Sequence, residues 1–133
     1  SPRVLNDSSK LFISFLSDPR MSKGHSLVVP RRHVVPGEDL LTTDEILAIE
    51  HETQRLERIL LSLGYMGVDS FQKTRPLIPE GTNGTKMDHY HRHIIPSSPG
   101  LNLYDDGIAW GHRDSWRKLP DGEREAMREA LAL

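Results

Sequence analysis

Three histidines, His89, His91 and His93, occupy alternate positions in the stretch HYHRHIIP. On a β-strand, alternate residues point to the same face, with a rise of about 3.3 Å per residue. Each imidazole has two ring nitrogens that need partners when the ring is buried, so three in a row are costly as simple packing. The pattern therefore predicts a functional strand from about residue 86 to residue 95, ended by Pro96.

Two kinds of chemistry suit such a row of imidazoles. Histidine is the commonest zinc ligand, and residues that alternate along a strand can share one ion. The second is nucleophilic catalysis, in which one ring nitrogen attacks while a hydrogen bond to the other selects the tautomer. For attack on phosphorus, neighbouring imidazoles and backbone N–H groups would stabilise the charge on the phosphate oxygens. The spacing alone does not separate these two interpretations.

The rest of the chain predicts an α+β fold. Strands are expected at 11–17, 25–30 and 67–74, and a terminal helix is expected in DGEREAMREALAL. A long helix is expected at about 43–63, begun by a capping box of Thr42 and Glu45 and stopped by Gly64. Its apolar stripe steps by three and four. The stripe comprises Ile46, Ile49, Thr53, Leu56, Leu60 and Leu63.

Composition narrows the class of protein. A chain of 133 residues predicts one domain, with a core at about 11–96 and a C-terminal tail at about 97–133. The absence of cysteine excludes disulfides, cysteine-ligated zinc and a thiol nucleophile, and it suits a cytoplasmic location. The net charge of −2 gives no strong signal for nucleic acid, and no apolar run is long enough to span a membrane.

The motifs on either side of the long helix resemble those of the histidine triad (HIT) family, over about residues 11–96. That family has His-x-His-x-His followed by two apolar residues, and an upstream strand that reads roughly Gly-His-x-Leu-Val-x-Pro. The matching residues here are Gly24, His25, Leu27, Val28, Pro30, His89, His91, His93, Ile94 and Ile95. The resemblance implies a mostly antiparallel five-stranded sheet with one long helix packed on it. It also implies a homodimer, a nucleotide as substrate and no cofactor.

The resemblance assigns catalytic roles to four histidines. His91 would be the nucleophile that takes a nucleoside monophosphate from the α-phosphate of a nucleotide conjugate. His89 and His93 would flank it, and His25 would join the same network. Family members that act as nucleotidyl transferases often have glutamine at the third triad position, so His93 favours a hydrolase. Candidate substrates are dinucleoside polyphosphates, nucleoside phosphoramidates and adenylylated molecules.

Five further residues are candidates for substrate binding. Thr85 and Lys86 replace an amide and a hydroxyl residue of the family, and Lys86 would either bind phosphate or point to solvent. Gln72 matches a polar residue on the strand before the triad. Asp18, or Ser17 beside it, would accept the ribose hydroxyls, unless Asp18 only initiates a turn with the following proline.

One departure and two alternatives stay open. Arg92 stands where the family usually has an apolar residue, and we expect it to face away from the triad into solvent rather than to contact another segment or subunit. The first alternative is a non-catalytic nucleotide-binding or interaction module that keeps the fold. The second is a metal-dependent histidine site.

Overall fold

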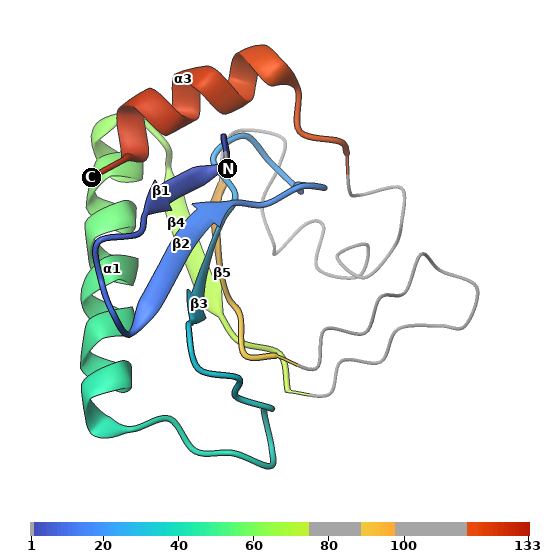
Figure 1. The fold of residues 1–133 in the computed structure, drawn as a ribbon. Helices are drawn as coiled ribbons and strands as arrows, with labels where there is room; N and C mark the ends of the chain where they lie inside the picture. The colour runs from blue at the N-terminus through green and yellow to red at the C-terminus, as the bar shows by residue number, and fades with distance from the viewer. Residues whose placement is uncertain (1, 75–88, 98–116) are drawn as a thin grey trace.

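The computed structural model describes residues 2–74, 89–97 and 117–133. Within these ranges, five strands form one antiparallel sheet in the order β1-β2-β3-β5-β4 (Figure 1). The strands are β1 (Val4–Asn6), β2 (Phe12–Leu16), β3 (Ser26–Pro30), β4 (Gly67–Phe71) and β5 (Arg92–Ser97). The sheet and its helices confirm the predicted α+β class, and β1 is a strand that the sequence pattern did not indicate.

Two helices complete the described structure. Helix α1 (Thr43–Ser62) packs against β2, β3, β4 and β5, while α3 (Asp121–Leu131) lies against α1 and β1 (Figure 1). Helix α1 begins with the predicted capping box, in which the Thr42 hydroxyl accepts from Glu45 N–H and the Glu45 carboxylate accepts from Thr42 N–H. Gly64 follows its end with a φ of 98°, a left-handed conformation that glycine adopts readily.

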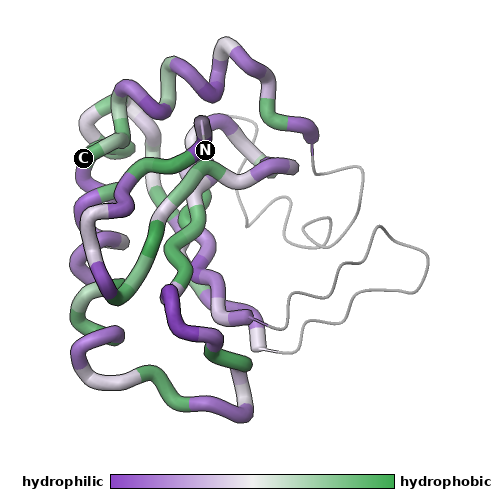
Figure 2. The backbone as a smooth tube through the Cα atoms, viewed as in Figure 1, coloured by the Kyte–Doolittle hydropathy of each residue, from purple (hydrophilic) through white to green (hydrophobic). Residues whose placement is uncertain are grey.

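The core lies between the sheet and α1, and it extends to α3. Alternate residues of β2 are buried, whereas every residue of β3, in the middle of the sheet, is buried. The chain is accordingly hydrophobic along both strands (Figure 2). The core side chains are Leu5, Phe12, Leu16, Val28, Ile49, Leu56, Leu60, Ile94, Leu119, Met127 and Leu131. None of the described helices is long and apolar enough to cross a membrane.

The buried face of α1 differs from the predicted apolar stripe at both ends. Ile46 and Leu63 are 53% and 50% exposed, so these two predictions were wrong. Ile46 lies in the first turn of α1, and Leu63 is the C-cap residue that follows its last helical residue. The buried face includes instead Glu52, which is 3% exposed and which a hydrophobic pattern cannot indicate.

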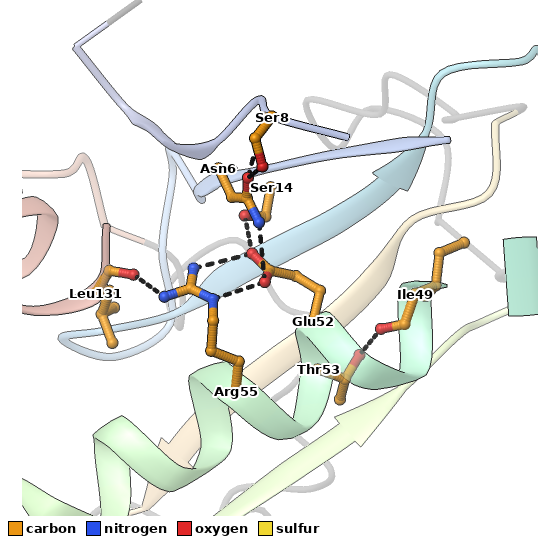
Figure 3. A network of polar contacts seen from close by, with 8 residues as sticks. All are labelled: Asn6, Ser8, Ser14, Ile49, Glu52, Thr53, Arg55 and Leu131. Carbon is orange, nitrogen blue, oxygen red and sulfur yellow. Dashed lines mark hydrogen bonds and ion pairs between the residues drawn. The ribbon is translucent and has the colours of Figure 1, made fainter. Parts of the chain in front are cut away.

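The carboxylate of Glu52 is the centre of a buried polar network (Figure 3). One oxygen accepts from Asn6 Nδ2 at 3.2 Å and Arg55 Nε at 2.7 Å, and the other accepts from Ser14 Oγ at 2.5 Å and Arg55 Nη2 at 3.0 Å. Arg55 also donates from Nη1 to the Leu131 carbonyl at 2.7 Å. The network therefore joins β1, β2, α1 and the end of α3.

The triad strand begins and ends later than predicted. Strand β5 starts at Arg92 and runs through Pro96, so His89 and His91 precede it and Pro96 does not end it. Strand β3 pairs with β5 only as far as Ile94, and beyond that point β4 is the sole partner of β5. Proline is tolerated at such a position because it need not donate a hydrogen bond to a second neighbouring strand.

Arg92 faces α1, on the side of the sheet opposite the triad, and it is not solvated as expected. Its guanidinium lies 3.3 Å from a Glu50 carboxylate oxygen on α1 and donates to Ser70 Oγ on β4 at 3.1 Å. The arginine thus replaces an apolar contact with a polar link between helix and sheet.

Candidate active site

Two histidines far apart in the sequence meet at the centre of the sheet. His25 immediately precedes β3, and the pairing of Ser26 with Ile94 and of Leu27 with His93 brings His93 of β5 beside it. His25 Nε2 lies 3.0 Å from His93 Nδ1, and the side chains are buried, with residue exposures of 1% and 5%. The structure therefore joins the upstream motif to the triad through a direct contact between rings.

The hydrogen bonds around His25 define the tautomers of both rings. The backbone N–H of Met21 donates to His25 Nδ1 at 3.1 Å, so that nitrogen carries no hydrogen. A neutral His25 then carries its hydrogen on Nε2 and donates to His93 Nδ1. His93 in turn carries its own hydrogen on Nε2. The direction of donation thus runs from Met21 through His25 to His93.

His91 has its hydrogen on Nδ1, unlike His25 and His93, which leaves a lone pair on Nε2. Its Nδ1 lies 2.8 Å from the His89 carbonyl oxygen, and because a carbonyl only accepts, Nδ1 carries the hydrogen. In a neutral ring, Nε2 is then unprotonated and nucleophilic. The ring meets His93 edge to face, with centroids 4.8 Å apart and planes at 73°. His91 is 8% exposed, so its position is well fixed by its surroundings.

The environment keeps these rings neutral. Burial, followed by the charge of Arg20 and by His91, lowers the pKa of His25 from 6.5 to about 3. Burial and then His25 lower the pKa of His93 to about 2. Burial also lowers the pKa of His91, although the hydrogen bond to the His89 carbonyl acts in the opposite direction. Neutral imidazole is the form that a nucleophile requires.

His89 contacts His91 through its backbone carbonyl, whereas its ring points to other partners. Its Nε2 donates to the Pro30 carbonyl at 3.1 Å, and its ring meets His33 edge to face, with centroids 5.0 Å apart. The three triad rings therefore do not form the single row expected of one continuous strand. The reason is that β5 begins only at Arg92, so the chain before it is not held to strand alternation.

Gln72 was predicted as a polar residue near the triad, and the structure brings it to His91. Its Oε1 accepts from the backbone N–H of His91 at 2.8 Å, and its Nε2 donates to the Lys73 carbonyl at 2.6 Å. In this structure the amide therefore fixes the backbone of the candidate nucleophile. Substrate binding by Gln72 stays a prediction.

The other predicted substrate-binding residues are placed differently. Ser17 Oγ donates to the Pro19 carbonyl at 2.6 Å, and Asp18 Oδ1 accepts from the backbone N–H of Leu119 at 2.9 Å. The Ser17 contact stabilises the turn, the Asp18 contact ties that turn to the segment before α3, and the ribose contact stays a prediction. Thr85 and Lys86 lie outside the described residues.

Three groups near the triad were missed by sequence reasoning. The Met21 N–H donor belongs to the backbone, so no residue type signals it. Phe71 stacks on His93, with ring centroids 5.3 Å apart, and packs with Met21 and Ile95. Lys73 is close enough for its charge to lower the pKa of His93. Lys73 lies two residues after Phe71, just beyond the end of β4, and its place in the strand expected at 67–74 was the available signal.

Metal coordination was the alternative that the spacing of the triad left open. Among residues 2–74, 89–97 and 117–133, no group of three or more His, Asp or Glu side chains is placed to hold an ion. The nitrogens that His25 and His93 turn toward each other are occupied by their mutual hydrogen bond.

The fold is shared with solved structures of low sequence identity. A zinc-bound histidine triad family protein from Mycobacterium smegmatis is 21% identical, with a TM-score of 0.66 over 98% of this chain and 85% of the other. A hypothetical histidine triad nucleotide-binding protein from Sulfolobus tokodaii strain 7 is 15% identical, with a TM-score of 0.64 over 97% of this chain and 80% of the other.

The sequence itself identifies the family. No curated protein matches the chain. The HIT domain family matches residues 3–100, a range that contains all four histidines of the site and ends before α3. The chain therefore belongs to the histidine triad family, as its two motifs indicated.

Proposed function

We propose that this protein is a nucleotide hydrolase or nucleotidyl transferase that cleaves at the α-phosphate of a nucleotide conjugate. The observation that carries the proposal is the state of His91. Its Nδ1–H is bound to the His89 carbonyl and its pKa is lowered by burial, so Nε2 offers a lone pair near neutral pH. The adjacent His25–His93 pair and the hydrogen bond that the His91 backbone N–H donates to Gln72 Oε1 hold the site together.

The reaction would proceed in two displacements. His91 Nε2 attacks the α-phosphorus, a P–N bond forms, and the bond from phosphorus to the leaving group breaks with its electron pair. The ring becomes cationic, and the Nδ1–H hydrogen bond to the His89 carbonyl strengthens as that charge develops. Water then attacks phosphorus, the P–N bond breaks, and a nucleoside monophosphate leaves with His91 regenerated. A second nucleophile in place of water would give transfer.

The neighbouring groups support the charge on phosphate. In the tautomer set by His25, His93 carries a hydrogen on Nε2 that suits donation to a phosphate oxygen or to the leaving group. Lys73 brings positive charge to the same region. Lys86 and Thr85 remain candidates for phosphate contacts, and His89 remains a supporting residue.

Two proteins of similar fold bear on the proposed substrate and on the metal-dependent alternative. The Sulfolobus tokodaii structure is described as nucleotide-binding, which agrees with a nucleotide conjugate as substrate. The Mycobacterium smegmatis structure is described as zinc-bound, which keeps a metal-dependent reaction as an alternative. Turnover that survives EDTA would exclude that alternative, whereas activity abolished by EDTA and restored by one metal would favour it.

The other alternative is a protein that binds nucleotides without catalysis. A nucleotide-binding module would bind dinucleoside polyphosphates, nucleoside phosphoramidates or adenylylated molecules without turning any of them over. We propose a homodimer, as the resemblance to the family implies, and a cytoplasmic location, which a chain without cysteine suits. Light scattering of the purified protein tests the dimer directly.

Trapping of the intermediate tests the proposed nucleophile. Wild-type protein is mixed with an α-phosphate-labelled conjugate and quenched in base, in which phosphohistidine-type bonds persist better than in acid. Label is expected on wild type and absent from His91→Asn. The matched control is His51→Asn, because His51 is exposed on α1 and should label like wild type. Label on His25 or His89, or near wild-type turnover by His91→Asn, would refute the assignment.

A further inference from the structure

The chain leading into α3 holds the loop between β2 and β3. Arg20 and Arg117 exchange backbone hydrogen bonds, with N–O distances of 2.7 and 2.9 Å. Two residues earlier, Asp18 accepts from the backbone N–H of Leu119. Figure 1 shows the segment that enters α3 beside this loop. The position of the loop is therefore coupled to that of the C-terminal segment.

A largely buried ion pair strengthens this coupling. Arg20 Nη2 lies 2.9 Å from Glu123 Oε2 in the first turn of α3, with side-chain exposures of 21% and 10%. Within the described residues, Arg20 Nε and Glu123 Oε1 are buried without a hydrogen-bond partner, so the pair is held by a single contact. Met127 and Leu131 anchor α3 in the core, which fixes the carboxylate relative to the sheet.

The next residue along the loop supplies the donor that sets the histidine tautomers. Met21 follows Arg20 directly, is 4% exposed, and donates its N–H to His25 Nδ1 at 3.1 Å. The hydroxyl of Ser22 donates to the Pro96 carbonyl at 3.0 Å and ties the same loop to β5. A displacement of Arg20 would therefore move a peptide that selects which nitrogen of His25 carries the hydrogen.

We propose that Glu123 is a positioning residue for the histidine pair: through Arg20 it holds the Met21 N–H against His25 and so keeps His93 in the tautomer with hydrogen on Nε2. This inference rests on the proposed function for its effect on turnover, but not for its effect on the rings. It assigns a role to α3, which lies beyond residue 100, where the match to the family ends.

The consequence for chemistry follows from the hydrogen bonds. Without the Met21 donor, His25 Nδ1 can carry the hydrogen, and Nε2 then has no hydrogen to give His93. His93 would move its own hydrogen to Nδ1 to bond His25, which removes the Nε2–H that we propose donates to the phosphate or the leaving group. Substrate would still bind His91 and its surroundings, so the loss is expected in kcat more than in KM.

The test compares Glu123→Ala with Glu125→Ala in the whole protein. Both changes remove a glutamate from α3, but the Glu125 side chain is 77% exposed and 3.9 Å from its nearest cation. Long-range proton–nitrogen NMR spectra of the imidazoles report the tautomers, and urea unfolding reports whether each variant is folded. Glu123→Ala is expected to shift the His25 and His93 ring-nitrogen signals and to lower kcat on the order of tenfold or more. Glu125→Ala should match wild type in both.

A second variant keeps the test decisive if Glu123→Ala does not fold. Glu123→Gln keeps the shape of the side chain and one acceptor oxygen. Its ring-nitrogen signals should lie between those of wild type and those of Glu123→Ala. Folded Glu123 variants with wild-type ring-nitrogen signals would overturn the inference, whatever their turnover. A wild-type protein with the predicted tautomers but without turnover of any tested conjugate would instead refute the proposed function.

Discussion

Replacing Glu52 with alanine is expected to destabilise the protein by about 3–5 kcal/mol, because it breaks a buried ion pair and leaves its partners unsatisfied. The carboxylate is 3% exposed and accepts from Arg55, Asn6 and Ser14. The Arg55 side chain is 22% exposed and donates a hydrogen bond to the Leu131 carbonyl. Water and that carbonyl therefore partly replace the lost carboxylate as partners of the guanidinium. The ion pair should therefore contribute near the low end, about 3 kcal/mol.

The two uncharged partners supply the remainder. Asn6 Nδ2 and Ser14 Oγ each lose a hydrogen bond to a charged acceptor, and each such loss costs roughly 1 kcal/mol or more when the group stays buried. The contributions are coupled because all three donors share one carboxylate, so their sum is an upper value. Glu52→Gln keeps one acceptor oxygen and the side-chain volume, and it should cost about half as much as Glu52→Ala.

Urea unfolding followed by far-UV circular dichroism measures this effect through the shift of the midpoint at constant slope. The matched control is Gln54→Ala, which truncates an exposed polar side chain of the same helix and should change stability by no more than about 0.5 kcal/mol. A Glu52→Ala protein within about 1 kcal/mol of wild type would refute the reasoning, because no buried ion pair could then depend on this carboxylate. A cost for Glu52→Gln above that of Glu52→Ala would refute it too.

Two further predictions concern backbone conformation and pH. Gly24 has a φ of 96°, and a Cβ there would lie 3.0–3.2 Å from three side chains, whereas Gly64 has a φ of 98° with nothing within 4 Å. Gly64→Ala should therefore cost about 1–2 kcal/mol for backbone strain alone, and Gly24→Ala clearly more; equal urea midpoints would contradict this. The native pKa values of about 3 for His25 and about 2 for His93 lie below the usual 6.5, so the unfolded chain binds more protons at intermediate pH. Their contribution to stability is complete above pH 6.5 and is lost as the pH falls from there toward 3, so the urea midpoint should be lower at pH 5 than at pH 7.5. His25→Asn should reduce that difference, and a difference equal to that of wild type would count against a neutral, buried His25.

Local patterns predicted the elements of the fold because their causes are local. The steps of three and four in α1, its capping box and Gly64 gave both helix ends within one residue. Strands β2 and β3 followed from short apolar runs bounded by turn residues. Strand β1 did not, since three residues are too few for a period and its pairing with β2 is a tertiary contact.

The resemblance to the family indicated which histidines to expect in the candidate site, but it could not indicate their hydrogen bonds. The resemblance placed His25 in the same network as the triad, and the pairing of β3 with β5 brings the His25 and His93 rings together. Spacing could not show that His89 would bind the Pro30 carbonyl, because the point at which β5 begins depends on pairing with other strands. It could not show the Met21 donor either, since every residue except proline has a backbone N–H.

The adjacency of β3 and β5 has a consequence for the order in which the molecule folds. Strands β2 and β3 are joined by a short connection, and α1 depends on its own capping and periodicity, so these units can form early. The contact of His25 with His93 requires two strands that are separated along the chain by all of α1 and β4. Closing so long a loop costs entropy before any native contact compensates it. The histidine pair is thus expected to assemble late, after most of the scaffold around it has formed.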